Sequence, residues 1–252
     1  MKLKDLETMI NEQEATVDSR YVGAALPALL RKTYLWMAFA MIITGIVAYG
    51  MATVTYTAAD GSTLPIAFKI FQSRGTFWIL FIAELGMVFT LSARIMRLSL
   101  PTATLLFIAY SAVNGVMLSA IFLVYTMQSI ASAFFVTAAT FGAMSLYGYF
   151  TKSSLDGLGK YLTMGLVGLI IAIAVNIFLH NGMLNLIISG VAVVLFTILT
   201  AYDTQKIKIM LALQPDAGEA AQRVALLGAL SLYLDFINSF IYILQFFGGR
   251  NN

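Results

Sequence analysis

The chain has 252 residues, of which 60% are hydrophobic and only 11% are charged. In soluble domains about a quarter of the residues are charged, so this composition excludes an ordinary soluble protein. It predicts an all-α polytopic membrane protein. The absence of cysteine excludes disulfides, thiol catalysis and cysteine-ligated metals. The net charge of +3 is spread over the ends of the hydrophobic runs and therefore indicates no nucleic-acid partner.

Residues 1–30 form a mixed-charge tail without the apolar core and small-residue cleavage site of a signal peptide. We expect this tail to precede a single membrane domain comprising residues 31–252. Seven apolar runs of about 20 residues follow, each long enough to cross a hydrocarbon core of about 30 Å as a helix. The predicted spans are residues 34–54, 76–93, 101–125, 130–150, 161–179, 184–202 and 226–247.

The third span and the connection between the fifth and sixth spans each contain a recognisable local pattern. Ser111, Gly115 and Ser119 recur every four residues in the third span, and such a small-residue face predicts the close approach of another helix. His180, the single histidine, is interpreted as a solvated turn residue between the fifth and sixth spans. A loop of about twenty residues is expected between the first and second spans.

The positions of lysine and arginine predict the orientation in the membrane. Twelve of these fifteen residues lie in the tail or in the loops after the second, fourth and sixth spans. Because cytoplasmic loops are rich in lysine and arginine, the amino terminus is predicted to be cytoplasmic and, with seven spans, the carboxy terminus external. A re-entrant last segment would return the carboxy terminus to the cytoplasm, and the carboxylate in its middle leaves this alternative open.

The last span carries an aspartate, Asp235, at a depth where membrane helices rarely hold a charge. Small and polar residues recur along this span at steps of three and four, so they share one helix face. They are Gly228, Ser231, Asp235, Asn238, Tyr242 and Gln245. Because a charge facing lipid is costly, this face is predicted to look into the bundle or a wet cavity, with Ser231 and Asn238 lining a pore.

Other ionisable residues lie within the predicted spans or at their ends. Glu84, at mid-span, is predicted to line a pore or to hold a structural hydrogen bond. Arg94 and Asp203 end two spans that run inward, so they lie at similar depth and can pair. Alternatively, Arg94 and Arg97 are positive-inside anchors and Asp203 is an interfacial residue. The helix that carries Asp203 is expected to continue to about residue 213.

Asp203 and Asp235 differ in predicted depth by a turn or two, so contact between them requires tilt or a shifted boundary. If they meet in a low dielectric, two carboxylates cannot both ionise cheaply, so they share a proton and titrate as a pair. Such a pair senses protons. Together with Glu84 it is also a possible transient calcium site, because hard cations prefer carboxylate oxygens.

The segments Thr200 to Lys206 and Leu230 to Ile241 resemble the two aspartate motifs of the Bax inhibitor family, in its bacterial branch, and the resemblance extends from about residue 31 to the end. It implies six helices around a central seventh in the inner membrane and a pH-dependent calcium leak. By this resemblance Asp203 and Asp235 are the proton-sharing pair. Arg94, with Arg97 as the alternative, is the arginine latch on Asp203.

These placements lead to a hypothesis for gating. Ionised Asp203 attracts Arg94 and closes the cytoplasmic end, whereas protonation of the aspartate pair releases this contact. Protonation also weakens the attraction for calcium, so the two effects oppose each other. The sequence therefore predicts a response to pH and leaves its sign open.

Two other functions have to be compared with the channel. An intramembrane aspartyl protease also uses two membrane aspartates, but such proteases have glycines before the second one, where this chain has bulky Leu232, Tyr233 and Leu234. We therefore expect no enzyme activity and no cofactor, with calcium, protons and the lipid bilayer as partners. The remaining alternative is a regulatory protein that binds a membrane protease or a stress-response partner through its charged tail.

Overall fold

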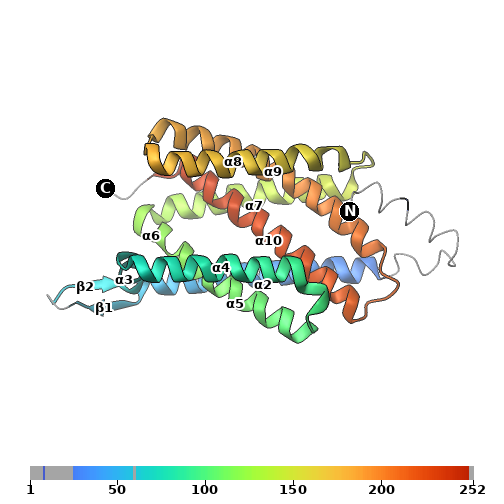
Figure 1. The fold of residues 1–252 in the computed structure, drawn as a ribbon, viewed down its shortest axis with the longest axis horizontal. Coiled ribbons are helices and arrows are strands. Elements are labelled where there is room, and N and C mark those ends of the chain that lie inside the picture. Colours follow the sequence, from blue (N-terminus) through green and yellow to red (C-terminus); the bar gives the residue numbers. More distant parts are fainter. Residues whose placement is uncertain (1–7, 9–24, 59–60, 250–252) are drawn as a thin grey trace.

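The structure is a computed structural model that describes residues 8, 25–58 and 61–249. Seven helical segments are long and apolar enough to cross a membrane, which confirms the predicted all-α membrane architecture. Most of the predicted tail, residues 1–30, lies outside the described residues. With the labels of Figure 1, the spans are α2 (Leu26–Thr53), α4 (Arg74–Arg94) with the 3-10 turn η1 (Ile95–Arg97), α5 (Leu100–Leu118) with α6 (Ala120–Val124), α7 (Met127–Phe150), α8 (Asp156–Leu179), α9 (Gly182–Ala212) and α10 (Glu219–Phe247).

The last helix, α10, forms the centre of the bundle. In Figure 1 it crosses obliquely between α8 and α9 on one side and α2, α4 and α5 on the other. In its most apolar stretch 72% of the residues are buried, whereas the value for the other spans does not exceed 39%. Lipid can cover the apolar faces of a membrane helix, but the polar groups of α10 require protein neighbours or water. The expected central position of the seventh span is therefore confirmed.

Side-chain caps define several helix starts. Ser99 Oγ accepts a hydrogen bond from the backbone N–H of Thr102 at 3.3 Å, and Asn181 Oδ1 accepts one from Leu184 at 3.1 Å. Such caps satisfy amides that have no partner within their own helix. Between α8 and α9, His180 adopts a left-handed conformation and its side chain is exposed, in agreement with its interpretation as a turn residue.

A short hairpin occupies the connection after α2, where the sequence predicted only a loop. Strand β1 (Thr55–Thr57) pairs antiparallel with β2 (Thr63–Pro65), and α3 (Ile66–Gln72) follows. Gly61 near the turn has φ of 81°, a left-handed conformation that glycine adopts without steric cost. Strands of three residues are too short for an alternating pattern to be recognised, which explains why the hairpin was not predicted.

The small-residue face of α5 packs closely against α2. Ser111 and Ser119 are fully buried, and a Cβ atom placed on Gly115 would lie only 2.7 Å from the carbonyl oxygen of Thr44. No larger side chain fits at this contact without displacing the backbone of α2. The predicted close approach is confirmed, and the structure identifies α2 as the partner.

Gly148→Ala is expected to destabilise the protein by about 1–3 kcal/mol, because its Cβ would overlap the backbone carbonyl of Ala201 and push α7 away from α9. Gly142→Ala in the same helix is the matched control, since its Cβ position has no described atom within 4 Å apart from the adjoining backbone of α7. There, the higher helix propensity of alanine is expected to leave stability equal or slightly higher. Thermal unfolding in detergent measures both variants, and equal midpoints would contradict the close approach of α7 and α9.

Candidate functional site

The polar face of α10 lines a pocket together with α8 and α9. Ser231, Asp235, Asn238 and Tyr242 of α10 and Asp203 of α9 surround a cavity of about 400 Å³. The other lining residues are apolar and come from all three helices. The structure thus brings together both aspartates and the two residues of α10 that the sequence predicted to line a pore.

Asp203 and Asp235 line the same pocket. Asp235 is only 5% exposed, and its Oδ2 atom has no hydrogen-bond partner among the described residues. Asp203 is partly buried. Lys206, about one turn further along α9, is the cation that acts on Asp203. Because an unpaired buried charge is costly, Oδ2 of Asp235 is positioned to hold a proton or to meet a cation.

The sequence predicted that Asp203 and Asp235 lie at different depths in the membrane. The lengths and the tilt of their helices explain why they nevertheless share a pocket. The helix α9 continues past Asp203 to Ala212, close to the predicted end at residue 213. The helix α10 begins at Glu219, ahead of the predicted span. With 31 and 29 residues, both exceed the length needed to cross a bilayer. The oblique path of α10 against α9 then brings the two carboxyl groups into one pocket (Figure 1).

Arg94 and Arg97 lie away from this pocket. Arg94 ends α4, Arg97 ends η1, and both side chains are exposed. In the described part of the chain, neither forms an ion pair with Asp203. The helix α4 packs mainly on α5, whereas α9 packs on α7, α8 and α10, so the two helix ends belong to different sides of the bundle. The expected contact between Arg94 and Asp203 is therefore absent from this conformation.

Glu84 belongs to a second polar cluster, which joins four helices. Nδ2 of Asn114 in α5 donates a hydrogen bond to Oε1 of Glu84 in α4. The hydroxyl of Tyr233 in α10 donates to Oδ1 of Asn114 at 3.1 Å and lies 2.7 Å from Oγ1 of Thr44 in α2. Glu84 does not line the aspartate pocket. Its position corresponds to the structural hydrogen bond that was one of its two predicted roles.

Sequence reasoning missed Thr44, Asn114 and Tyr233 in this cluster. Asn114 is a polar amide in the middle of an apolar span, and its depth was the signal that could have found it. Tyr233 lies two residues before Asp235, about 200° around the helix axis, so it points to the opposite side of α10. The central helix therefore presents polar groups on two faces, one to the pocket and one to the cluster.

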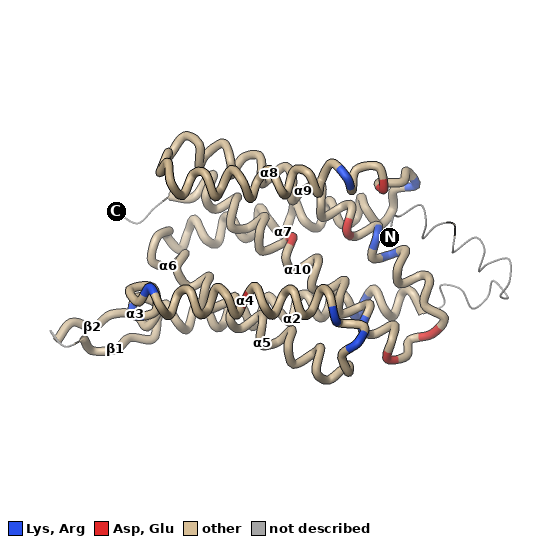
Figure 2. The backbone as a smooth tube through the Cα atoms, in the orientation of Figure 1, with Lys and Arg blue, Asp and Glu red and all other residues tan. Residues whose placement is uncertain are grey.

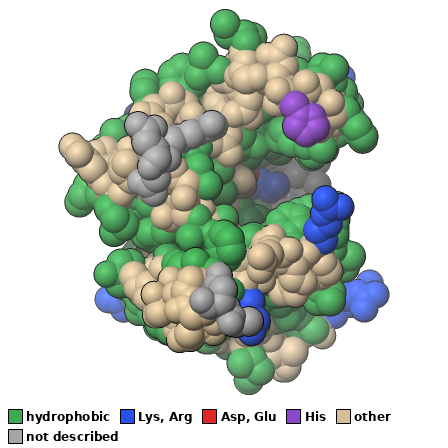
Figure 3. All heavy atoms as spheres, turned by 90° about the vertical axis from the view of Figure 1, so that its left-hand side faces the viewer, with side chains coloured by type: hydrophobic (Ala, Val, Ile, Leu, Met, Phe, Trp, Pro, Cys, Tyr) green, Lys and Arg blue, Asp and Glu red, His purple; other side chains and the backbone are tan. Residues whose placement is uncertain are grey.

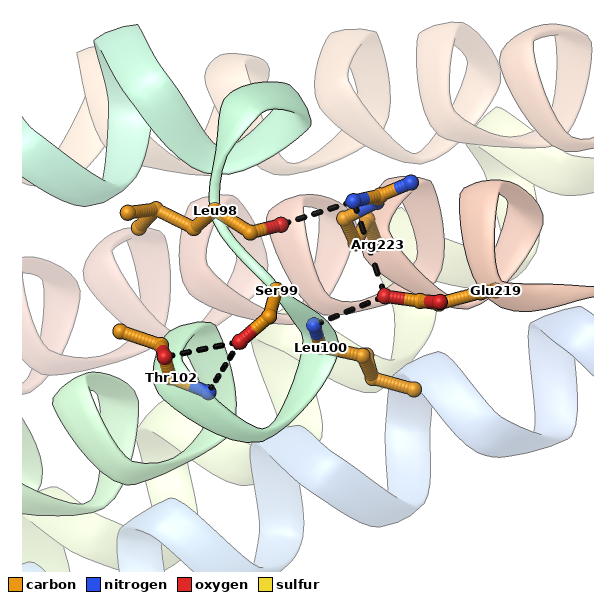
Figure 4. A network of polar contacts seen from close by, with 6 residues as sticks. All are labelled: Leu98, Ser99, Leu100, Thr102, Glu219 and Arg223. Carbon is orange, nitrogen blue, oxygen red and sulfur yellow. Dashed lines mark hydrogen bonds and ion pairs between the residues drawn. The ribbon is translucent and has the colours of Figure 1, made fainter.

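Arg223 and Glu219 attach the start of α10 to the turn between η1 and α5 (Figure 4). Nη1 of Arg223 donates to the carbonyl oxygen of Leu98 at 2.7 Å and lies 3.7 Å from Oε1 of Glu219. The same Glu219 oxygen accepts from the backbone N–H of Leu100 at 3.0 Å. The sequence had assigned Arg223 only to the positive-inside residues, but the structure gives it specific partners.

Most charged residues lie at the two ends of the bundle (Figure 2). Most of the described lysines and arginines lie at the end where η1 meets the start of α10. Away from the helix ends, the acidic residues of the described chain are Glu84, Asp203 and Asp235. The opposite end, which carries the hairpin and the α8–α9 turn, is hollowed near its centre, with Lys or Arg side chains at the rim and within the hollow (Figure 3).

Comparisons with known proteins extend this description. A family model described as "Inhibitor of apoptosis-promoting Bax1" matches residues 26–252. The inner membrane protein YbhL of Escherichia coli is 43% identical over 229 residues, which cover 90% of this chain and 94% of the relative. A protein of Rickettsia prowazekii is 40% identical over 237 residues, covering 94% of this chain and 96% of the relative. Together with the seven apolar helices, these similarities support a multi-pass protein of the bacterial inner membrane.

Proposed function

The chain belongs to the Bax inhibitor family, and we propose that it acts as a pH-dependent calcium leak channel rather than as an enzyme. The observation that carries this proposal is the pocket shared by Asp203 and Asp235, in which Oδ2 of Asp235 has no hydrogen-bond partner within the part of the chain that the structure describes. A proton or a divalent cation would satisfy this oxygen. In the proposed orientation the amino terminus is cytoplasmic.

Proton sensing follows from the surroundings of the two carboxyl groups. A carboxylate in a mostly apolar pocket loses hydration, and a second carboxylate beside it adds repulsion. The two groups therefore titrate as one coupled pair and share a proton over part of the pH range. Each change in protonation alters the negative charge that the pocket offers to a cation. Calcium is the proposed cation because it prefers several oxygen ligands and tolerates irregular geometry.

The proposed path follows the polar face of α10. Beyond Asp235 toward the carboxy-terminal end of the helix, Asn238 and Tyr242 continue the polar lining of the pocket, while Ser231 lies on its other side. Glu84 contributes to this path indirectly, through the hydrogen-bonded cluster that holds α4, α5 and α10 together.

The arginine latch remains a prediction about a second conformation. Arg94 is exposed and unpaired with Asp203 in the described conformation, so closing the latch requires the end of α4 to approach α9. Arg94 supplies the positive charge for such a contact and Asp203 the negative charge. Protonation releases this contact, which favours calcium flux, but it also weakens the attraction of the pocket for the cation, which disfavours flux. The proposal therefore predicts that the flux changes with pH, whether it rises or falls on acidification.

Asp235→Asn is expected to abolish the pH dependence of calcium flux, because asparagine keeps the shape of the side chain and removes the titrating group. Calcium entry into liposomes that contain the purified protein is measured between about pH 5 and pH 8, above the pKa of about 3.9 of an ordinary aspartate. We expect a pH-dependent flux for the natural sequence and a flat profile for the variant.

Asp216→Asn is the matched control for this experiment. Asp216 is exposed in the turn after α9, and its Oδ1 accepts a hydrogen bond from the backbone of Gly218, which the asparagine oxygen preserves. The control is expected to retain the natural pH profile. Flux that is absent at every pH, with correctly folded protein, would contradict the channel proposal and favour a partner-binding role.

A further inference from the structure

A second cavity lies between α2 and α7, on a different face of α10 from the aspartate pocket. It measures about 290 Å³, and its floor consists of Phe236, Ile237 and Phe240 of α10. The ends of α5 and α6 close one side. In the described part of the chain, α2 and α7 have no extensive contact with each other, so the cavity separates these two helices.

The lining of this cavity offers almost nothing to a polar ligand. Thr44 contributes a hydroxyl group to the lining, but this group already has partners in the protein. It donates to the carbonyl oxygen of Ser111 at 2.9 Å and lies 2.7 Å from the hydroxyl of Tyr233. No charged side chain is among the described lining residues. A buried water needs two to four polar partners, so this cavity is unsuited to water.

The cavity opens toward the hydrocarbon core of the membrane. All of its lining residues belong to segments that span the membrane, and Tyr49, Phe134 and Phe135 at its walls are exposed on the outside of the bundle. The neighbouring lipid-facing surface is also apolar, since Ile42 and Ile46 of α2 are exposed. The molecules that meet this opening in a bilayer are therefore lipid acyl chains.

We propose that this cavity binds one acyl chain of a membrane phospholipid. An apolar protein cavity of about 150 Å³ already accepts benzene, and this one is about twice as large. A helix of a second protein copy is about 10–12 Å across with its side chains, whereas an acyl chain is a single file of methylene groups. Because lipid is as apolar as the cavity, binding gains no hydrophobic energy and is driven by the dispersion contacts that an empty cavity lacks.

Gly45 provides a way to fill this cavity without disturbing the backbone. It lies in the cavity wall on α2, and apart from the adjoining backbone of α2 no atom of the described residues lies within 4 Å of the position of a Cβ. The side chain of Gly45→Leu is therefore expected to occupy the space of the acyl chain. Gly50→Leu is the matched control, because Gly50 lies on the same helix with equally free space and is not part of the cavity wall.

The test uses the full chain in liposomes that contain a phospholipid with a photoactivatable group in the middle of its acyl chain. After illumination, labelled peptides are quantified by mass spectrometry. We expect stronger labelling of the cavity walls in α2 and α7 than of the exposed, lipid-facing side of α8. Gly45→Leu is expected to reduce wall labelling about tenfold, which corresponds to the loss of about ten carbon contacts. Gly50→Leu is expected to leave it unchanged.

Ala131→Leu fills the cavity from the opposite wall on α7, where Ala131 is exposed, and is expected to have the same effect if Gly45→Leu fails to fold. Wall labelling equal to that of α8, or unchanged in both filling variants, would overturn the proposal.

Discussion

The double variant Asp203→Asn/Asp235→Asn is expected to show the same flat pH profile of calcium flux as either single variant. Both carboxyl groups line one pocket and are proposed to share a proton, so removing either one is expected to abolish the shared proton. The effects of two groups that act as one unit do not add. We expect a coupling energy within about 0.5–3 kcal/mol from a double-mutant cycle on the calcium flux at a fixed pH.

The same cycle with Asp216 in place of Asp203 is the control. Asp216 is exposed in the turn after α9 and does not line the aspartate pocket, so its substitution is expected to add nothing to Asp235→Asn. A strictly additive cycle for Asp203 and Asp235 would show that the two carboxyl groups titrate independently. The proposed pair would then be wrong even if each single variant altered the flux.

Arg223→Met is expected to lower the stability of the protein by about 1.5–3 kcal/mol, the usual contribution of a hydrogen bond to a charged group. The substitution keeps much of the length of the side chain but removes the donor to the carbonyl oxygen of Leu98. Glu219 then keeps only its bond from the backbone of Leu100. Since these contacts attach the start of the central helix to the η1–α5 turn, we expect a lower thermal midpoint and looser packing at this end (Figure 4).

Arg97→Met is the matched control for this prediction. Arg97 lies nearby in η1, is exposed, and loses the same positive charge on substitution, so any effect on membrane orientation is equal in the two variants. Its effect on stability is expected to be small, as for most surface substitutions. Thermal unfolding of the two variants in the same detergent provides the comparison, and equal midpoints would mean that the Arg223 contacts contribute nothing to stability.

The properties of single helices were predicted from local patterns. The number of spans follows from apolar length, since each run exceeds what a bilayer requires. The polar face of α10 follows from the spacing of Ser231, Asp235, Asn238 and Tyr242, and these four residues do line one pocket. The extension of α9 beyond Asp203 follows from continued helical spacing. Each of these features depends on residues that are close together in the sequence.

Contacts between residues on different helices could be predicted from the sequence only in part. Arg94 and Asp203 have matching depth and opposite charge, yet their helices pack on different neighbours and the contact is absent. Conversely, Asp203 and Asp235 differ in predicted depth, yet the tilt of α10 brings them together. Depth along the membrane normal is one coordinate, and contact also requires the position of each helix around the bundle.

The sequence by itself determined that this is a seven-span membrane protein with carboxylates on apolar helices and a polar face on its last span. Only the tertiary structure decided which of those groups meet: Asp203 with Asp235, Glu84 with Asn114 and Tyr233, and Arg223 with the η1–α5 turn. The physical reason is that helix periodicity follows from local geometry, whereas helix neighbours and crossing angles follow from close packing over the whole bundle.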